Sequence, residues 1–201
     1  MKILYFSLKG GVGKSSIALN HAIHNSYAYV TNDITTSTDG ECVSEFHHIP
    51  HNTKRIPKKL LPLQDVIFDF GAMSSVIDAK VTQAVTHCDC VVIPTLTDAR
   101  SIQATMNTYD LIKEKAKRVV IIINNFQKEE KCLYAKVQLD HLKRKVLILE
   151  MKHTTLFERV ARDGVLWYTK IGSQKGEYRL QKTKLEHQKI YEAIQNYGAQ
   201  R

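Results

Sequence analysis

The stretch that most constrains the fold is a glycine-rich loop that joins an apolar run to a helical one. The apolar run is KILYFSL, and the loop that follows it at once reads KGGVGKSS. From about Lys14 to His24, the apolar residues Ile17, Ala18 and Ile23 recur at helical spacing. A strand, a tight glycine turn and a helix therefore follow one another, as in domains that alternate strands and helices.

The rest of the chain repeats this alternation. Five further runs read YAYVTND, DVIFDF, CVVIPT, RVVIIINN and KVLILE, and several are continuously apolar, as buried parallel strands are. Helical patterns are expected at residues 74–86, 101–116, 129–142, 155–163 and 175–197. The sequence predicts a single domain, residues 1–201, in three α/β/α layers around a mostly parallel central sheet.

Two segments depart from this alternation. Residues 35–64, rich in threonine, histidine and proline, are expected to form an irregular, mobile segment or a short insertion. Residues 175–201 are expected to form a basic C-terminal helix.

The composition points to a polyanionic partner. Lys and Arg number 29 against 20 Asp and Glu, which gives a net charge of +9. Such a charge favours a nucleic acid or an acidic membrane surface, unless it serves solubility alone. The four cysteines are scattered, no secretory leader is recognised, and no apolar run reaches the ~20 residues that cross a bilayer. A reducing cytoplasm is the expected location.

The glycine loop has the residues of a phosphate-binding loop. Its glycines allow successive backbone N–H groups to converge on phosphate oxygens at a helix N-terminus. Lys14 would reach the β- and γ-phosphates, and the Ser15 hydroxyl would bind Mg²⁺. The ordinary pattern G-x-x-x-x-G-K-[ST] requires a glycine where this chain has Leu8, so the loop is a variant.

A nucleotide hydrolase also needs an acid near the metal, at the end of a neighbouring strand. The run VIFDFG places Asp69 there. Taken alone, such an acid is as often a structural strand end as a metal ligand, and the loop upstream favours the second interpretation. The letters DFG also occur in protein kinases, but the kinase catalytic loop does not accompany them here.

These residues resemble the ParA/MinD family of deviant Walker ATPases, P-loop NTPases whose loop reads K-G-G-x-G-K-[ST]. The match is KGGVGKS, and it continues in order through the strand ending at Asp33, VIFDFGAMSSV, CDCVVIPTLTD, VVIIINN and LFERVARDG. The short, single-domain plasmid-partition members, such as ParF, look most similar. The resemblance implies the P-loop NTPase fold and an ATPase with ATP and Mg²⁺ as cofactors.

The resemblance also assigns roles to individual residues. Lys9 matches the signature lysine, which in the family crosses a dimer interface to the partner's phosphates. Lys14 would bind phosphate and Asp33 would place the attacking water, so Lys9, Lys14 and Asp33 are expected to be catalytic. Ser15 would bind Mg²⁺ directly, and Asp69 and Asp33 through water. The residues expected at the nucleotide are Lys9, Gly10, Gly11, Val12, Gly13, Lys14, Ser15, Ser16 and Asn124, with Asn124 at the adenine ring.

The chain departs from the family pattern in its switch segment. The family's D-x-D-P-Q is replaced by TNDIT, so Thr31 replaces the first acid, and Ile34 and Thr35 replace the proline and glutamine. Likewise, DFGA replaces the more common D-x-P-P after the strand. Hydrolysis is therefore expected to be slow and stimulated by a partner.

The implied partners follow from the same family. They are a second copy of the chain on ATP, a ParB-like adaptor or centromere-binding protein, and non-specific DNA, in plasmid or DNA partition on the nucleoid. DNA contacts are expected on the tail helix, at Arg179, Lys182, Lys184 and Lys189. The basic runs at residues 54–59 and 143–145 are further candidates, although each run alone is more often a solvated face.

Other functions remain open. A MinD-like or conjugation-associated positioning ATPase would act at a membrane or protein apparatus, and a small-molecule P-loop kinase or synthase ranks third. MinD-like proteins end in an amphipathic membrane helix. The tail here has a thin apolar stripe that indicates packing onto the domain, which disfavours a membrane. That stripe is Leu185, Ile190, Ile194 and Tyr197.

The remaining histidines and cysteines carry weaker signals. His47, His48 and His51 lack carboxylates or cysteines at ligand spacing, so a metal site is disfavoured. Cys88 and Cys90 flank the start of an apolar strand and are expected to be small core residues.

Overall fold

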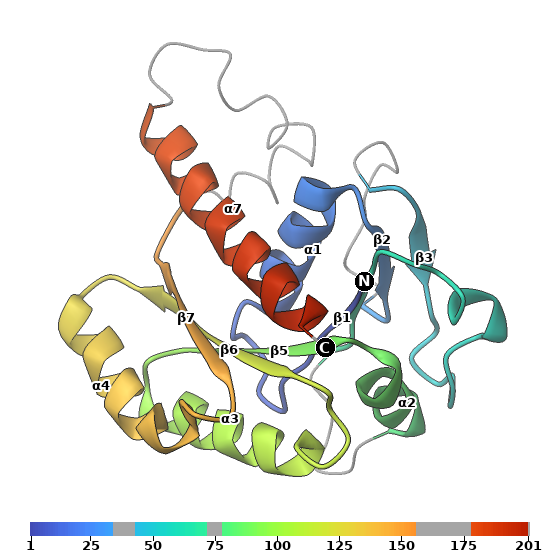
Figure 1. Ribbon diagram of the computed structural model, residues 1–201, viewed down its shortest axis with the longest axis horizontal. Helices are drawn as coiled ribbons and strands as arrows, with labels where there is room; N and C mark the ends of the chain where they lie inside the picture. Colours follow the sequence, from blue (N-terminus) through green and yellow to red (C-terminus); the bar gives the residue numbers. More distant parts are fainter. Residues whose placement is uncertain (34–42, 72–77, 156–177, 201) are drawn as a thin grey trace.

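The computed structural model describes residues 1–33, 43–71, 78–155 and 178–200 (Figure 1). Its strands are β1 Lys2–Tyr5, β2 Ala28–Thr31, β3 Phe46–His48, β4 Val66–Asp69, β5 Cys90–Thr95, β6 Val119–Phe126 and β7 Leu147–Lys152. Its helices are α1 Lys14–Asn25, α2 Ala79–His87, α3 Ala99–Ile112, α4 Glu129–Leu139 and α7 Tyr178–Ala199, with 3₁₀ turns at Lys58–Leu60 and Asp140–Leu142.

These strands form one parallel sheet in the order β3-β2-β4-β1-β5-β6-β7. β1 lies in the centre and pairs with β4 on one side and β5 on the other. β4 and β5 are buried along their whole length because helices cover both faces, which explains their continuously apolar sequences. Since the strands are parallel, their carboxyl ends meet at one edge of the sheet.

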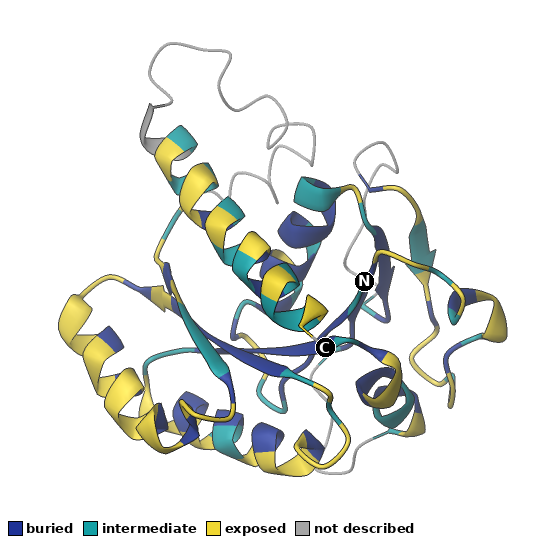
Figure 2. Ribbon diagram, viewed as in Figure 1, coloured by how far each residue is buried: buried dark blue, intermediate teal, exposed yellow. Residues whose placement is uncertain are grey.

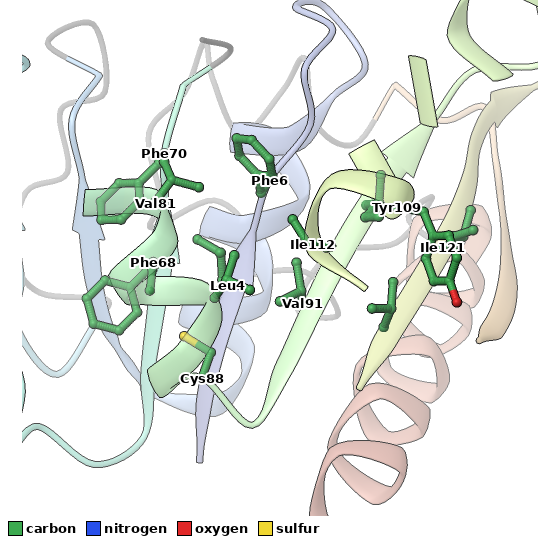
Figure 3. Close-up of a cluster of buried hydrophobic side chains, with 14 of the residues drawn as sticks. Leu4, Phe6, Phe68, Phe70, Val81, Cys88, Val91, Tyr109, Ile112 and Ile121 are labelled. Carbon is green, nitrogen blue, oxygen red and sulfur yellow. The ribbon is translucent and has the colours of Figure 1, made fainter. Parts of the chain in front are cut away.

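Helices α2, α3 and α4 cover one face of the sheet, and α1 and α7 cover the other (Figure 1). Phe68, Val81 and Tyr109 belong to the core on the first face, which Figure 3 shows in close-up. Ile17 and Ile194 belong to the core on the second face. Figure 2 shows the contrast between the buried sheet and the exposed outer sides of the helices. The predicted α/β/α class is confirmed.

Element boundaries lie within a few residues of the expected ones, with some differences. Residues 46–48 form the edge strand β3 inside the segment expected to be irregular, because three residues with two histidines give no readable strand pattern. The second strand ends at Thr31 rather than Asp33. The helix expected at residues 155–163 lies outside the described residues, except for Thr155.

Tail helix α7 packs onto the domain through one side. Tyr191 and Ile194 are fully buried, and Ile190 and Tyr197 pack against them. Leu185, however, is 58% exposed, so the expectation that it packs inward is wrong. It lies two residues before the buried His187, which places it on the opposite side of the helix.

The buried cysteines behave as expected. Cys88 and Cys90 are fully buried in the two cores. Burial raises the pKa of Cys90 to about 12, so this thiol stays protonated. Among the described residues, no cluster of histidine, cysteine and carboxylate side chains could hold a metal ion, and no helix is long and apolar enough to span a membrane.

A buried aromatic cluster joins α1 to α7. His21 is fully buried and stacks on Tyr191, with ring centroids 4.5 Å apart. Its Nδ1 lies 2.8 Å from the hydroxyl oxygen of Tyr5. Burial, with a smaller effect of nearby His24, lowers the pKa of His21 to about 3. The folded protein therefore holds this imidazole in its neutral form.

We predict that His21 makes the protein sensitive to acid. Its folded pKa is below the unfolded value of about 6.5, so its contribution to stability is complete above pH 6.5 and is lost as the pH falls toward 3. The free energy of unfolding should fall by about 2 kcal/mol more between pH 8 and pH 5 in the wild type than in His21→Phe. Urea unfolding at the two pH values measures this difference.

His141→Gln, a change at an exposed histidine, serves as the control and should lose stability with pH as the wild type does. Equal losses in the wild type and His21→Phe would contradict the role of His21.

Candidate functional site

The glycine loop leaves the carboxyl end of β1 and enters α1 at Lys14. Gly11 and Gly13 have φ values of 72° and 83°, a conformation that favours glycine. Helix α1 has no capping side chain and no acid in its first turn, whereas Asp78 and Asp98 cap α2 and α3. Its first N–H groups are thus left for an anion.

Lys14 and Asp69 form a buried ion pair beneath this loop. Nζ of Lys14 lies 3.1 Å from Oδ1 of Asp69, and the side chains are 8% and 0% exposed. The other carboxylate oxygen, Oδ2, accepts a 2.7 Å hydrogen bond from the Tyr29 hydroxyl of β2. Burial, with the charge of Asp69, raises the pKa of Tyr29 well above its usual value, so the phenol remains a donor. Both oxygens of the acid are therefore held in place.

Asn124, near the end of β6, packs against the same loop. Its Nδ2 donates a 2.9 Å hydrogen bond to the carbonyl oxygen of Val12. A Cβ atom built on Gly13 would lie 2.4 Å from this nitrogen, whereas one built on Gly11 would meet nothing within 4 Å. Gly13 is therefore required both for its backbone conformation and for the space that Asn124 fills.

Two adjoining hollows lie along the loop. The first has a volume of about 210 Å³ and is lined by residues 9–16. The second, of about 190 Å³, shares Gly11, Gly13 and Ser16 with the first. Its other lining residues are Leu96, Asn124, Asn125, Lys152, His153 and Thr154. The pair forms one continuous surface from the first turn of α1 to the carboxyl ends of β6 and β7.

Asp33 and Lys9 are the other two residues predicted to be catalytic. Asp33 follows β2 and is partly exposed, and its N–H donates to Oγ1 of Thr31 at 3.0 Å. Lys9 is also partly exposed. Hydrogen bonds from Ser101 are the main cause that lowers the pKa of Asp98, and the charge of Lys9 contributes. Lys9 therefore lies close enough to the N-terminus of α3 to act on that carboxylate.

The structure thus brings some predicted residues together and leaves others apart. Lys14, Asp69 and Asn124 converge on the loop that carries Ser15. Of the tail residues, Lys182 and Lys189 are exposed on α7 and Lys184 is partly exposed. The side chain of Arg179 lies outside the described part.

Sequence reasoning missed three residues of this region. Tyr29 carries a hydroxyl inside a fully buried strand, which signals a hidden hydrogen-bond partner. Asn125 has a φ of 59° at an irregularity in the β6–β7 pairing, and its Oδ1 lies 2.6 Å from Nδ1 of His153. Paired asparagines at a strand end were the available signal, since asparagine tolerates this conformation.

Comparisons with known proteins place this geometry in a familiar fold. No protein-family model matches the chain, and a search of curated proteins finds no match. Among solved structures, MinD of Pyrococcus horikoshii with Mg-ADP aligns at a TM-score of 0.67 and 12% identity, covering 100% of this chain and 99% of that one. A ParA family ATPase of Chlorobium tepidum aligns at 0.63 and 15%, covering 92% and 96%.

An ATP complex of a McdA variant from Cyanothece aligns at a TM-score of 0.65 and 10% identity, covering 96% of each chain. At these identities the likeness establishes the fold: the chain has the P-loop α/β architecture of the ParA/MinD ATPases. Similarity to one branch of that group, such as ParF, stays a prediction.

We predict that removing only one partner of the Lys14–Asp69 pair destabilises the protein more than removing both. Lys14→Met leaves a buried carboxylate without its cation, so the free energy of unfolding should fall by about 3 kcal/mol. The double variant Lys14→Met/Asp69→Asn removes the stranded charge and should recover most of that loss. Urea denaturation measures both.

The matched control is Lys113→Met, which breaks the exposed pair between Lys113 and Asp110. This change should have little measurable effect, because exposed pairs contribute little. If the Lys14→Met variant unfolds at the same urea concentration as the wild type, the pair does not stabilise the fold.

We further predict that Gly13→Ala and Gly11→Ala differ in severity. Both force alanine into a left-handed conformation, at a cost of about 1 kcal/mol. Only the first also places a methyl group against Asn124, so it should destabilise the protein more. Adding Asn124→Ala to Gly13→Ala should reduce the excess; thermal unfolding that ranks the two glycine variants equally would disprove the packing argument.

Proposed function

We propose that the protein is an ATPase of the ParA/MinD type, which binds ATP with Mg²⁺ and pairs with a second copy of itself on ATP. The observation that carries this proposal is the buried Lys14–Asp69 pair beneath a glycine loop that opens an uncapped helix. A lysine, an acid and free N–H groups at a helix N-terminus, all at one glycine loop, are typical of a phosphate-binding site. The fold shared with nucleotide-bound MinD and McdA structures supports it.

The phosphates would lie along residues 9–16, where the N–H groups of the first turn of α1 face them. Lys14 would exchange its contact with Asp69 for one with the β- and γ-phosphates. Mg²⁺, when bound, would neutralise charge on these phosphates. Ser15 would hold the metal directly, while Asp69, fixed by Tyr29, and Asp33 would hold it through water. Asp33 would also place the attacking water.

The base would occupy the second hollow. Its lining combines an apolar Leu96 with the amides of Asn124 and Asn125 and the imidazole of His153. A purine ring has both a π-face and hydrogen-bonding edges, so this mixture suits it. Asn124 is the residue proposed to face adenine, although its amide also bonds Val12.

Lys9 would act across a dimer. Phosphoryl transfer is catalysed mainly by positioning and by neutralising charge on the transferred group. A lysine supplied by the second copy ties that catalysis to assembly, so ATP would favour the dimer and hydrolysis would release it. With Thr31 in place of the first switch acid, turnover would be slow and raised by a partner.

We propose that this cycle serves plasmid or DNA partition in the cytoplasm, on the nucleoid. Non-specific DNA and a ParB-like adaptor or centromere-binding protein are the proposed partners, and the positive net charge supports the first. A MinD-like or conjugation-associated role at a membrane or protein apparatus is the alternative. The exposed Leu185 favours it, whereas the burial of Tyr191 and Ile194 leaves no free apolar face on residues 181–199 of α7.

We predict that Lys9 and Lys14 separate dimerisation from nucleotide binding. Lys14→Ala should weaken binding of a fluorescent ATP analogue at least tenfold, because it removes the phosphate-binding cation. Lys9→Ala should bind the analogue as the wild type does but fail to form the ATP-dependent dimer in light scattering.

Lys115→Ala, at an exposed lysine, should change neither measurement. A Lys9→Ala protein that dimerises normally would remove Lys9 from the interface, and undiminished ATP binding by Lys14→Ala would refute the nucleotide site itself.

A further inference from the structure

We propose that the exposed cations of residues 54–59 form a surface that binds the phosphate backbone of double-stranded DNA. We call this surface the basic edge; its cations are Lys54, Arg55, Lys58 and Lys59. The inference rests on the DNA-binding part of the proposed function and deepens it, because it moves the contacts from α7 to the opposite face of the sheet.

The four cations of the basic edge are all exposed, and none of their charged side-chain groups has a hydrogen bond or ion pair with another described residue. The sequence around them contains no acid from Phe46 to Gln64, and helix α2 contains none either. Within residues 46–64 and 79–87, four exposed positive charges are therefore presented with no acid among them, which raises the positive potential of this edge.

The nearest acids in the sequence are already engaged. Glu45 lies 2.8 Å from His47, and Asp78 lies 3.5 Å from the buried amine of Lys80. Asp65 lies 2.6 Å from the amino group of Met1. Their carboxylates are therefore directed to other partners rather than to the basic edge.

The basic edge is anchored rather than loose. Ile56 and Leu60 are buried in the core beneath α2. The N–H of Ile56 donates to Oε1 of Gln83 on α2 at 2.9 Å, and Nζ of Lys80 donates to the carbonyl oxygen of His51 at 3.1 Å. Lys58 and Lys59 lie in a 3₁₀ turn that follows Pro57. Because the backbone is held, binding orders side chains only.

An open hollow lies beside these cations, between the basic edge and α2. It is lined by Arg55, Ala79, Thr82, Gln83, Thr86 and His87. Arg55 offers a guanidinium fork that can bind a phosphate at this hollow, whereas the Thr86 hydroxyl and Nδ1 of His87 are already bonded to the backbone carbonyl oxygens of Thr82 and Gln83. The exposed residues of this region appear beside α2 in Figure 2.

The described residues of the basic edge and of α2 include no exposed large apolar side chain, which favours DNA over other polyanions. The large apolar residues that are exposed in the described part of the chain are Leu111, Leu133, Tyr134, Val137 and Leu185. None belongs to the basic edge or α2. Peripheral membrane binding uses apolar residues that enter the lipid, and protein interfaces use apolar or aromatic anchors. A charged surface without either suits a phosphate backbone.

The tail helix is a weaker candidate on the same criteria. Along its described exposed side, Lys182 and Lys189 alternate with Glu186 and Glu192. Opposite charges at such spacing offset one another. The basic edge has four cations and no acid over a shorter length, so it presents the higher local charge.

The test compares two variants that lose the same number of lysines. K54Q/K58Q/K59Q alters the basic edge and K182Q/K184Q/K189Q alters α7, so both lower the net charge by three. Binding to two unrelated 25-base-pair duplexes is followed by fluorescence anisotropy from 50 to 200 mM salt, without nucleotide and with ATP and Mg²⁺. Circular dichroism and thermal unfolding verify that both variants fold.

The basic-edge variant should bind both duplexes at least tenfold more weakly at 50 mM salt. Its salt slope should fall by about 3, since each neutralised phosphate contributes about 0.9. The α7 variant should stay within about twofold of the wild type, and adding Arg55→Gln to the basic-edge variant should weaken binding further.

Equal losses in the two variants, or wild-type binding by the basic-edge variant, would overturn the assignment while leaving DNA binding itself intact. A wild type that binds no duplex but binds vesicles of acidic phospholipid would overturn both the basic edge and the DNA part of the proposed function. ATP binding, measured separately, would still decide the nucleotide site.

Discussion

The buried pair between Lys14 and Asp69 is the interaction on which the rest of the structure depends. Removing two charges from water costs several kcal/mol for each ion, so the pair persists only where geometry and further hydrogen bonds offset that cost. Lys14 comes from the first turn of α1 and Asp69 from the end of β4. The glycine loop must therefore bring α1 directly over the sheet, and Gly11 and Gly13 supply the backbone conformations that permit it.

Tyr29 adds a third partner to the pair. While Lys14 holds one oxygen of Asp69, Tyr29 holds the other, so the carboxylate stays oriented if Lys14 turns to an anion in the loop. In the proposed ATPase, Oδ1 of Asp69 would then be free to accept a hydrogen bond from a water held by Mg²⁺. Because Tyr29 lies in β2, two residues before Thr31, the orientation of the acid is coupled to the strand that leads to Asp33.

The sequence predicts the fold and the loop well because both arise from local patterns. Continuous apolar runs identify buried parallel strands, and GGVGKS between a strand and a helix identifies the cradle. Edge strand β3 was not predicted, because Phe46–His48 is short, half-exposed and lacks an apolar pattern. The contacts of Tyr29, His153 and Gln83 were not predicted for another reason. Each contact joins residues that are far apart in the chain, and no local sequence pattern identifies the partner.

The nucleotide site and the proposed DNA-binding surface are held by helices on opposite faces of the sheet. Helix α1 links the loop to α7 through His21 and Tyr191, whereas the basic edge is anchored to α2 on the other face. Pairing of two copies would then double the number of basic edges without altering either one. A second edge held near the same duplex binds at a high effective concentration, so overall affinity rises with no new contact. Nucleotide state could thus control DNA binding through assembly alone, with no conformational signal crossing the sheet.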